Sequence, residues 1–269
     1  SYSKNNIIKE KMEEKAITNL ELQKVANEVR KGIVTGVHAA KAGHPGGSLS
    51  AADIFTYLYF EEMNIDPKNP KMENRDRFVL SKGHVAPGLY STLAERGFLP
   101  KEDLVTFRHT GSYLQGHPDM KSTPGVDMST GSLGQGISAA VGMAIAGKLD
   151  KKDYTVYTLL GDGEIQEGQV WEAAMLAGHR HLDNLIVIVD NNGLQIDGNV
   201  ADVNSPYPID KKFEAFNFEV INLHKYGTFR KPVNRSLHRR RIFRKDKRRI
   251  SGSSHRITRK RKEPFQLHS

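Results

Sequence analysis

Two polar segments, each directly after an apolar run, have the composition of a site for a divalent cation and a phosphate group. The apolar run 154–160 is followed by Gly-Asp-Gly, whose acid is Asp162, and the apolar run 184–189 is followed by Asp-Asn-Asn, which ends at Asn192. A carboxylate and an amide supply the hard oxygen ligands that Mg²⁺ or Ca²⁺ prefers. The glycines allow the backbone to approach a phosphate closely because they carry no side chain.

The elements around these segments predict that the two polar ends lie side by side. The runs 154–160 and 184–189 are rich in β-branched residues, and the segment between them has a helical pattern. Such a β-α-β unit predicts two parallel strands. Open α/β sheets bind ligands at the carboxyl ends of their strands, which is where both polar segments fall. The sequence therefore predicts a metal and phosphate site at one edge of a parallel sheet.

The rest of the chain alternates between helical and strand patterns. A helix is expected over 17–41, with Thr18 or Asn19 as its cap, and a second helix over 51–63, with Ser48 or Ser50 as its cap. Further expected elements are a strand at 78–80, helices at 86–96, 101–107 and 137–149, a loop at 193–208, a helix at 209–216 and a strand at 218–222. This order predicts an α/β fold, a doubly wound parallel sheet with helices on both faces.

Three histidines lie in loops that contain glycine, namely His44, His84 and His117. His44 and His84 each precede a predicted helix, and a helix N-terminus attracts anions. Imidazole titrates near neutral pH, so it suits proton transfer. A loop histidine is commonly a solvent-exposed turn residue, and from the residues alone both interpretations stay open.

Composition restricts the class of protein. The chain has no cysteine, which excludes disulfides and thiolate metal sites. The polar N-terminus does not resemble a signal peptide, and no apolar run approaches the 18 or so residues of a membrane helix. A cytoplasmic protein without membrane contact is therefore expected. The net charge of +9 arises from residues 224–269, which contain 17 Lys or Arg and 2 Asp or Glu.

Four separated segments resemble the amino-terminal, diphosphate-binding half of transketolase. They read AKAGHPGGSLSAADIFTYLYF, RFVLSKGHVAPGLYSTLAERGFL, GHPDMKSTPGVDMSTGSLGQGIS and GDGEIQEGQVWEA followed by NLIVIVDNNGLQIDG. They occur in the family's order and cover about residues 17–222. The style of the second segment resembles the split form of the enzyme, whose two halves are separate subunits. The resemblance implies the thiamine-diphosphate-binding fold.

The resemblance also implies roles at the cofactor and metal site. Asp162, the side chain of Asn192 and the carbonyl of Leu194 would hold Mg²⁺, which bridges the two phosphates of thiamine diphosphate. Gly163 and His84 would contact the diphosphate, with Asn192 also beside the cofactor.

Further roles implied by the resemblance concern the aminopyrimidine, the interface between subunits and the substrate. The backbone at three positions would hold the aminopyrimidine ring: Gly131, Ser132 and Leu133. Ser132 replaces the family's usual proline. Glu167 would be a catalytic residue at the subunit interface, near the acid that activates the cofactor. His44 and His117 would line the substrate channel as the other catalytic residues.

The resemblance implies an enzyme subunit that is incomplete alone. Transketolase transfers a two-carbon ketol unit from a ketose phosphate to an aldose phosphate in the pentose phosphate pathway. The pyrimidine-binding domain is absent from this chain, so a C-terminal transketolase subunit is the expected partner, in a dimer of such pairs acting on sugar phosphates. The alternatives are another thiamine-diphosphate enzyme, such as deoxyxylulose-phosphate synthase or a dehydrogenase E1 subunit. The GHPGGS and GHPD loops favour transketolase.

The basic tail departs from the family. We assign residues 1–223 to the thiamine-diphosphate-binding domain and residues 224–269 to a tail without strand or helix periodicity. Three interpretations compete: a tail that binds nucleic acid through its charge, an unrelated disordered extension, and translation in the wrong reading frame. The third is favoured, because residues like those of the family reappear when plausible codons are shifted by one nucleotide. A shifted frame would remove a final helix and strand of the domain.

Overall fold

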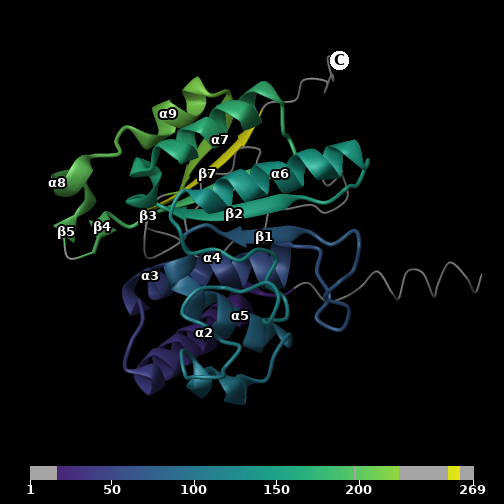
Figure 1. Cartoon of the computed structure of the whole chain (residues 1–269), viewed down its shortest axis with the longest axis vertical. Helices are drawn as coiled ribbons and strands as arrows, with labels where there is room; N and C mark the ends of the chain where they lie inside the picture. The colour runs from purple at the N-terminus through teal and green to yellow at the C-terminus, as the bar shows by residue number, and fades with distance from the viewer. Residues whose placement is uncertain (1–16, 197, 224–253, 261–269) are drawn as a thin grey trace, which may run out of the picture.

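The computed structural model describes residues 17–196 and 198–223, together with the backbone of the strand at 254–260. Figure 1 shows helices packed around one main sheet. The elements are α2 (Asn19–Ala40), α3 (Pro45–Ser50), α4 (Ala52–Tyr57), the π-helix η1 (Leu58–Glu62), β1 (Arg77–Leu80), the 3₁₀ helix η2 (Gly83–Val85), α5 (Ala86–Arg96), the 3₁₀ helix η3 (Lys101–Thr106), α6 (Gln135–Leu149), β2 (Val156–Gly161), the 3₁₀ helix η4 (Glu164–Gln166), α7 (Gly168–His179), β3 (Leu185–Asn191), β4 (Leu194–Gln195), β5 (Gly198–Asn199), α8 (Val200–Asn204), α9 (Ile209–Ala215), β6 (Phe218–Leu223) and β7 (Ser254–Lys260).

The main sheet has the strand order β1-β2-β3-β7-β6. Strands β1, β2 and β3 are parallel, as predicted for the two apolar runs. Residue Gly161, at the end of β2, is the register partner of Asp190 on β3, so the two polar segments leave the sheet side by side. The α/β fold with a doubly wound sheet is therefore confirmed.

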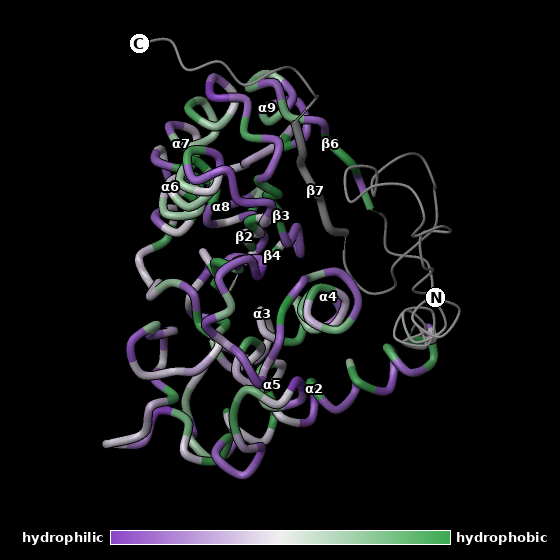
Figure 2. The backbone as a smooth tube through the Cα atoms, turned by 90° about the vertical axis from the view of Figure 1, so that its right-hand side faces the viewer, coloured by the Kyte–Doolittle hydropathy of each residue, from purple (hydrophilic) through white to green (hydrophobic). Residues whose placement is uncertain are grey.

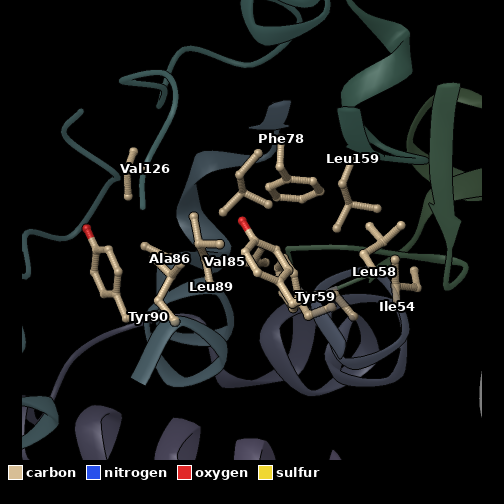
Figure 3. Packing of buried hydrophobic residues seen from close by; sticks show 14 of the residues in the cluster. Ile54, Leu58, Tyr59, Phe78, Val85, Ala86, Leu89, Tyr90, Val126 and Leu159 are labelled. Carbon is tan, nitrogen blue, oxygen red and sulfur yellow. The ribbon is translucent and has the colours of Figure 1, made fainter. Parts of the chain in front are cut away.

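Alternate residues of β1, β2 and β3 pack against opposite layers of helices, which is the period of two expected of strands buried on both faces. Phe78 of β1 and Leu159 of β2 belong to the core shared with α4 and α5, and Figure 3 shows them facing Tyr59 and its neighbours on that helical layer. Val79 and Leu160, one residue along, belong to the core shared with α6 and α7. Figure 2 shows β2 and β3 between α6 and α7 on one side and α4 on the other.

Most predicted helices are present, and their ends have local causes. Helix α2 begins after Thr18, whose hydroxyl accepts from the Glu21 backbone N–H while the Glu21 carboxylate accepts from the Thr18 N–H. This capping box confirms Thr18 rather than Asn19 as the cap. Helix α5 has the predicted bounds and ends at Gly97 in a left-handed conformation. Among the described helices, none has the length and apolar character needed to cross a membrane.

The glycine-rich loop before the second predicted helix is helical itself, so this expectation was wrong. Helix α3 begins at Pro45 with His44 as its N-cap, because proline at the first helical position has a suitable φ and needs no N–H partner. Ser48 and Ser50 therefore lie inside α3 and cap nothing. Ser48 Oγ donates to the His44 carbonyl at 2.9 Å. The prediction that His44 precedes a helix N-terminus is confirmed.

Two segments carry structure that was not predicted. The expected loop at 193–208 contains the β4-β5 hairpin and α8. Within the basic tail, residues 254–260 form β7, which pairs antiparallel with β3 and β6. Strand β7 was missed because its sequence, SHRITRK, has one apolar residue and no alternation of apolar and polar positions. The predictions for the rest of 224–269 lie outside the described residues.

Candidate active site at the carboxyl edge of the sheet

Asp162, the acid of the Gly-Asp-Gly turn, is buried at the end of β2 with 1% of its surface exposed. Its two carboxylate oxygens accept hydrogen bonds from the backbone N–H of Gly163 at 3.1 Å and of Gly193 at 2.7 Å. Burial raises the pKa of the Asp162 carboxyl, and the nearby Asp190 carboxylate raises this pKa further. A buried acid under these conditions is stabilised when a cation binds it.

The other predicted metal ligands lie on the segment that follows β3. Asn192 Oδ1 accepts from the backbone N–H of Leu194 at 2.9 Å, which turns the chain into the β4-β5 hairpin. Because Gly193 donates to Asp162, this segment is tied to the acid on the neighbouring strand. In the described part of the chain, no group of three or more His, Cys, Asp or Glu side chains gathers as a metal cluster. A cation at Asp162 would therefore use amide, carbonyl and phosphate oxygens, which is the donor set that suits Mg²⁺.

Glycines bring the loops of the site into close contact. A Cβ added at Gly163 would lie 3.1 Å from Gln195 Cγ, and one added at Gly131 would lie 3.2 Å from the ring of His117. A Cβ at Gly83 would lie 2.8 Å from the backbone N of Gly131. A side chain at Gly83 would force its loop away from Gly131, whereas one at Gly163 or Gly131 would displace its neighbour by a few tenths of an ångström. The residues thus fit a ligand that the backbone must approach closely, such as a diphosphate.

The three histidines of the sequence analysis are brought together. The rings of His44 and His84 pack edge to face with centroids 5.0 Å apart. Burial, together with the positive charges of Lys82, His44 and His117, lowers the pKa of His84 to about 4. Burial and the charges of Arg108 and His44 also lower the pKa of His117. His84 and His117 are therefore neutral at pH 7, so each ring has one nitrogen that accepts a hydrogen bond and one that donates.

A buried ion pair that the sequence did not reveal lies behind the histidines. Lys82, which follows β1, contacts Asp190 at the end of β3 with 2.6 Å between Nζ and Oδ2, and the two side chains are 2% and 0% exposed. Ser50 Oγ donates to the other Asp190 oxygen at 2.9 Å. The pair joins the loop of His84, the end of α3 and the segment of Asn192. The signal in the sequence was a lysine directly after a strand, in SKGH, but its partner is 108 residues away.

Glu164 is a second residue that the sequence analysis did not identify. Its carboxylate is 3% exposed and accepts from Ser81 Oγ at 2.5 Å, from the Gly134 N–H at 2.9 Å and from the Gly161 N–H at 3.0 Å. Burial raises the pKa of the Glu164 carboxyl. This acid therefore connects the ends of β1 and β2 to the turn before α6, and it fixes the loops that carry the predicted cofactor contacts.

The remaining predicted site residues lie on the surface beside this edge. Ser132 is exposed, and the Leu133 side chain is 39% exposed. Glu167 is exposed and is the N-cap residue of α7. Gly134 has φ +80, and a Cβ there would lie 2.7 Å from Glu167 Cβ, so the turn before α6 packs against the start of α7. The structure thus places the aminopyrimidine positions and the predicted interface acid next to one another.

Comparison with known proteins identifies relatives along most of the chain. The profile of a family described as "Transketolase, thiamine diphosphate binding domain" matches residues 22–249, which includes part of the basic tail. The 6-deoxy-6-sulfo-D-fructose transketolase subunit SqwG of Clostridium sp. is 48% identical over 209 residues, 78% of this chain and 76% of that protein. An apulose-4-phosphate transketolase subunit of Phocaeicola vulgatus is 46% identical over 207 residues, 77% of this chain and 73% of that protein.

A solved structure has the same fold. The transketolase of Campylobacter jejuni matches with a TM-score of 0.69 and 41% identity, covering 72% of this chain and 32% of that chain. The chain therefore spans most of the length of relatives that are separate subunits and about a third of the length of a transketolase that is one polypeptide.

Proposed function

The chain belongs to the transketolase family, in the part that binds thiamine diphosphate, and on that premise we propose that it is one subunit of a two-chain transketolase. The reaction we propose is the transfer of a two-carbon ketol unit from a ketose phosphate to an aldose phosphate. The observation that carries this proposal is the convergence of Asp162, the Asn192 segment and the three histidines at one edge of the sheet. These are the residues to which the resemblance assigned the metal, the diphosphate and the substrate.

The residues of this chain suit thiamine diphosphate and Mg²⁺. Asp162, Asn192 and the Leu194 carbonyl would hold the cation, while the backbone near Gly163 and the His84 ring would face the diphosphate. When bound, the cofactor supplies a carbon nucleophile that breaks and forms bonds to the substrate carbonyl carbon. The protein supplies the position of the reacting groups and the electrostatics of the site.

Neutral histidines are the groups of this chain that would handle substrate protons. The lowered pKa of the exposed His117 imidazole favours its neutral form at pH 7, in which one nitrogen would accept a proton from a substrate hydroxyl and the other would donate a hydrogen bond. His44 lies against His84 and would bind a neighbouring hydroxyl. Both rings lie on loops fixed by glycine contacts, which limits their movement.

The substrate is a sugar with a terminal acidic group. The names of the two subunit relatives specify a sulfonated sugar, 6-deoxy-6-sulfo-D-fructose, and a phosphorylated sugar, apulose 4-phosphate. We retain the sugar phosphates of the pentose phosphate pathway as the first candidates and add these two sugars as the next. Assays with each donor in turn separate the three, and transfer from pyruvate in place of a ketose would instead indicate a different thiamine-diphosphate enzyme.

The partner we propose is a second chain with the pyrimidine-binding domain. The relatives of similar length are named as subunits, which supports an enzyme made of two chains. Glu167 is exposed beside the turn before α6, where a second chain could reach it. We further propose that pairs of the two chains associate as a dimer.

Binding of the cofactor by this chain and its partner tests the function directly. Substitution Asp162→Asn removes the buried negative charge and is expected to weaken Mg²⁺-dependent binding of thiamine diphosphate at least tenfold, as measured by isothermal titration calorimetry. Asp150→Asn, at the opposite end of α6, is the control and should bind as the parent does. Equal affinity for all three proteins would contradict the metal assignment, and absence of sugar transfer by the parent pair would contradict the proposed reaction.

We also propose that the tail after residue 223 is a product of the wrong reading frame, although its residues 254–260 form β7 of the main sheet. The coding DNA for 218–269 tests this idea, because the shifted frame must be open and must encode family residues. The alternative from another class is nucleic-acid binding through the tail, supported by its charge of 17 basic and 2 acidic residues. RNA binding at physiological salt that is lost on deletion of 224–269 would favour this alternative.

A further inference from the structure

Arg108 has a backbone conformation that is unfavourable for arginine. Its φ is +61, in the left-handed region, which side chains other than those of Gly, Asn and Asp rarely adopt. The conformation is held by a hydrogen bond from the Arg108 N–H to the Leu114 carbonyl at 2.9 Å and by Phe107, which is buried directly before it. Residues in such strained conformations occur mainly at functional sites, where the surrounding structure holds them in place.

The guanidinium of Arg108 lies against the loop that carries His117. A Cβ added at Gly116 would lie 3.1 Å from both Cζ and Nη1 of Arg108, so glycine at this position leaves room for the guanidinium. Gly116 directly precedes His117, and the charge of Arg108 lowers the pKa of the His117 imidazole. The arginine is therefore positioned beside one of the residues that would contact the substrate.

No acid in the described residues neutralises this guanidinium. Arg30 and Arg75 form ion pairs with Asp53 and Asp127, whereas the guanidinium of Arg108 forms neither a hydrogen bond nor an ion pair within the parts of the chain that the structure describes. The side chain is exposed and contacts the Phe107 ring, with Cζ 6.0 Å from the ring centroid. Its five N–H donors remain available for an anion.

We propose that Arg108 binds the terminal oxyanion, phosphate or sulfonate, of the sugar substrate and so helps to determine substrate specificity. The planar guanidinium matches a tetrahedral oxyanion with two parallel hydrogen bonds. The diphosphate of the cofactor is expected at the Asp162 and Gly163 edge, whereas Arg108 lies at the His117 loop. This inference rests on the proposed transketolase function.

The test compares acceptors with and without the anion, using the complex of this chain with its pyrimidine-domain partner. The substitution Arg108→Gln is expected to lower the ratio of kcat/KM for D-erythrose 4-phosphate to kcat/KM for D-erythrose about tenfold, the loss of one charge-assisted contact. Arg108→Lys should retain part of this ratio. Lys101→Gln, which removes an exposed charge paired with Glu95, is the control and should keep the parent ratio.

The outcomes separate the alternatives. A sulfonated acceptor assayed in parallel shows whether kcat/KM falls more for the phosphorylated or for the sulfonated acceptor when Arg108 is replaced. An equal loss of kcat/KM for the charged and the uncharged acceptor would overturn the proposal. Weaker assembly with the partner, without a change in the ratio, would also overturn it, because the guanidinium would then bind an acid of the partner. Absence of transfer by the parent complex would overturn the proposed function and this inference with it.

A second variant distinguishes binding from a structural role. Arg108→Gly relieves the left-handed strain, so its Tm should equal or exceed that of Arg108→Gln while the specificity ratio stays low. A Tm for Arg108→Gly well below that of the parent would show that the side chain stabilises the loop, and it would contradict the proposal.

Discussion

Replacement of Lys82 by methionine is expected to destabilise the fold by about 3–5 kcal/mol, the usual cost of removing one partner from a buried ion pair. The Asp190 side chain is 0% exposed, so water cannot reach the carboxylate that remains. Ser50 Oγ would still donate a hydrogen bond to it at 2.9 Å. Lys82→Met keeps most of the apolar volume, so the loss reports the unpaired charge rather than a cavity.

The double variant separates the charge from the packing. With Lys82→Met and Asp190→Leu together, neither charge of the pair remains, and the expected loss includes the hydrogen bond from Ser50, about 1 kcal/mol. The double variant is therefore expected to lose roughly 2–4 kcal/mol less than Lys82→Met alone. This result would mean that the pair is kept to fix the loops around His84 and Asn192 rather than to add stability.

Urea denaturation followed by circular dichroism measures all four proteins. Unchanged m-values would show that the variants unfold from the same compact state. Lys31→Met is the matched control, because Lys31 pairs with Glu28 on the exposed side of α2 and should cost no measurable stability. A loss in the free energy of unfolding below about 1 kcal/mol for Lys82→Met would refute the idea that an unpaired buried charge destabilises the fold. Losses of the two single variants that add up, within about 0.5 kcal/mol, to the loss of the double variant would refute it as well.

Two further predictions concern a histidine and a glycine of the site. The folded-state pKa of His84 is about 4, and its value in the unfolded chain is 6.5. Between these two pH values the folded protein binds fewer protons than the unfolded chain. Its free energy of unfolding should therefore fall as pH drops from 6.5 towards 4. At pH 5 the loss in the free energy of unfolding is about 1 kcal/mol after allowance for the partial exposure of His84. The variant His84→Gln should therefore show a smaller fall in urea midpoint between pH 7.5 and pH 5 than the parent. Equal falls in both proteins would contradict the assignment. Gly134→Ala should cost about 2 kcal/mol in the same assay, because φ is +80 and the new Cβ would lie 2.7 Å from a neighbouring side chain. Gly142→Ala is the control, since this helical glycine has open space and alanine there should add about 0.5–1 kcal/mol. A stabilising Gly134→Ala would show that the turn has another conformation.

Local patterns in the sequence were sufficient to predict most elements and one half of the site. Apolar runs and a helical period between them predicted β2, α7 and β3 in parallel order, and the structure confirms it. Because parallel strands end at the same edge, Asp162 and Asn192 could be expected side by side without any knowledge of distances. A helix cap at Thr18 or Asn19 was predicted, and the structure shows that Thr18 is the cap.

Contacts between residues distant in sequence were decided by the tertiary structure. Lys82 and Asp190 are 108 residues apart, and their pairing depends on β1 and β3 flanking β2 in the same sheet. Glu164 binds backbone groups on two other segments, and a backbone N–H leaves no signal in the sequence. The strain at Arg108 is likewise a property of the folded loop, since φ is fixed by its neighbours. The sequence by itself determined which polar residues follow the strands and which edge of the sheet they share. The tertiary structure decided which buried charges and glycine contacts hold them there, because those interactions depend on the packing of segments that no local pattern describes.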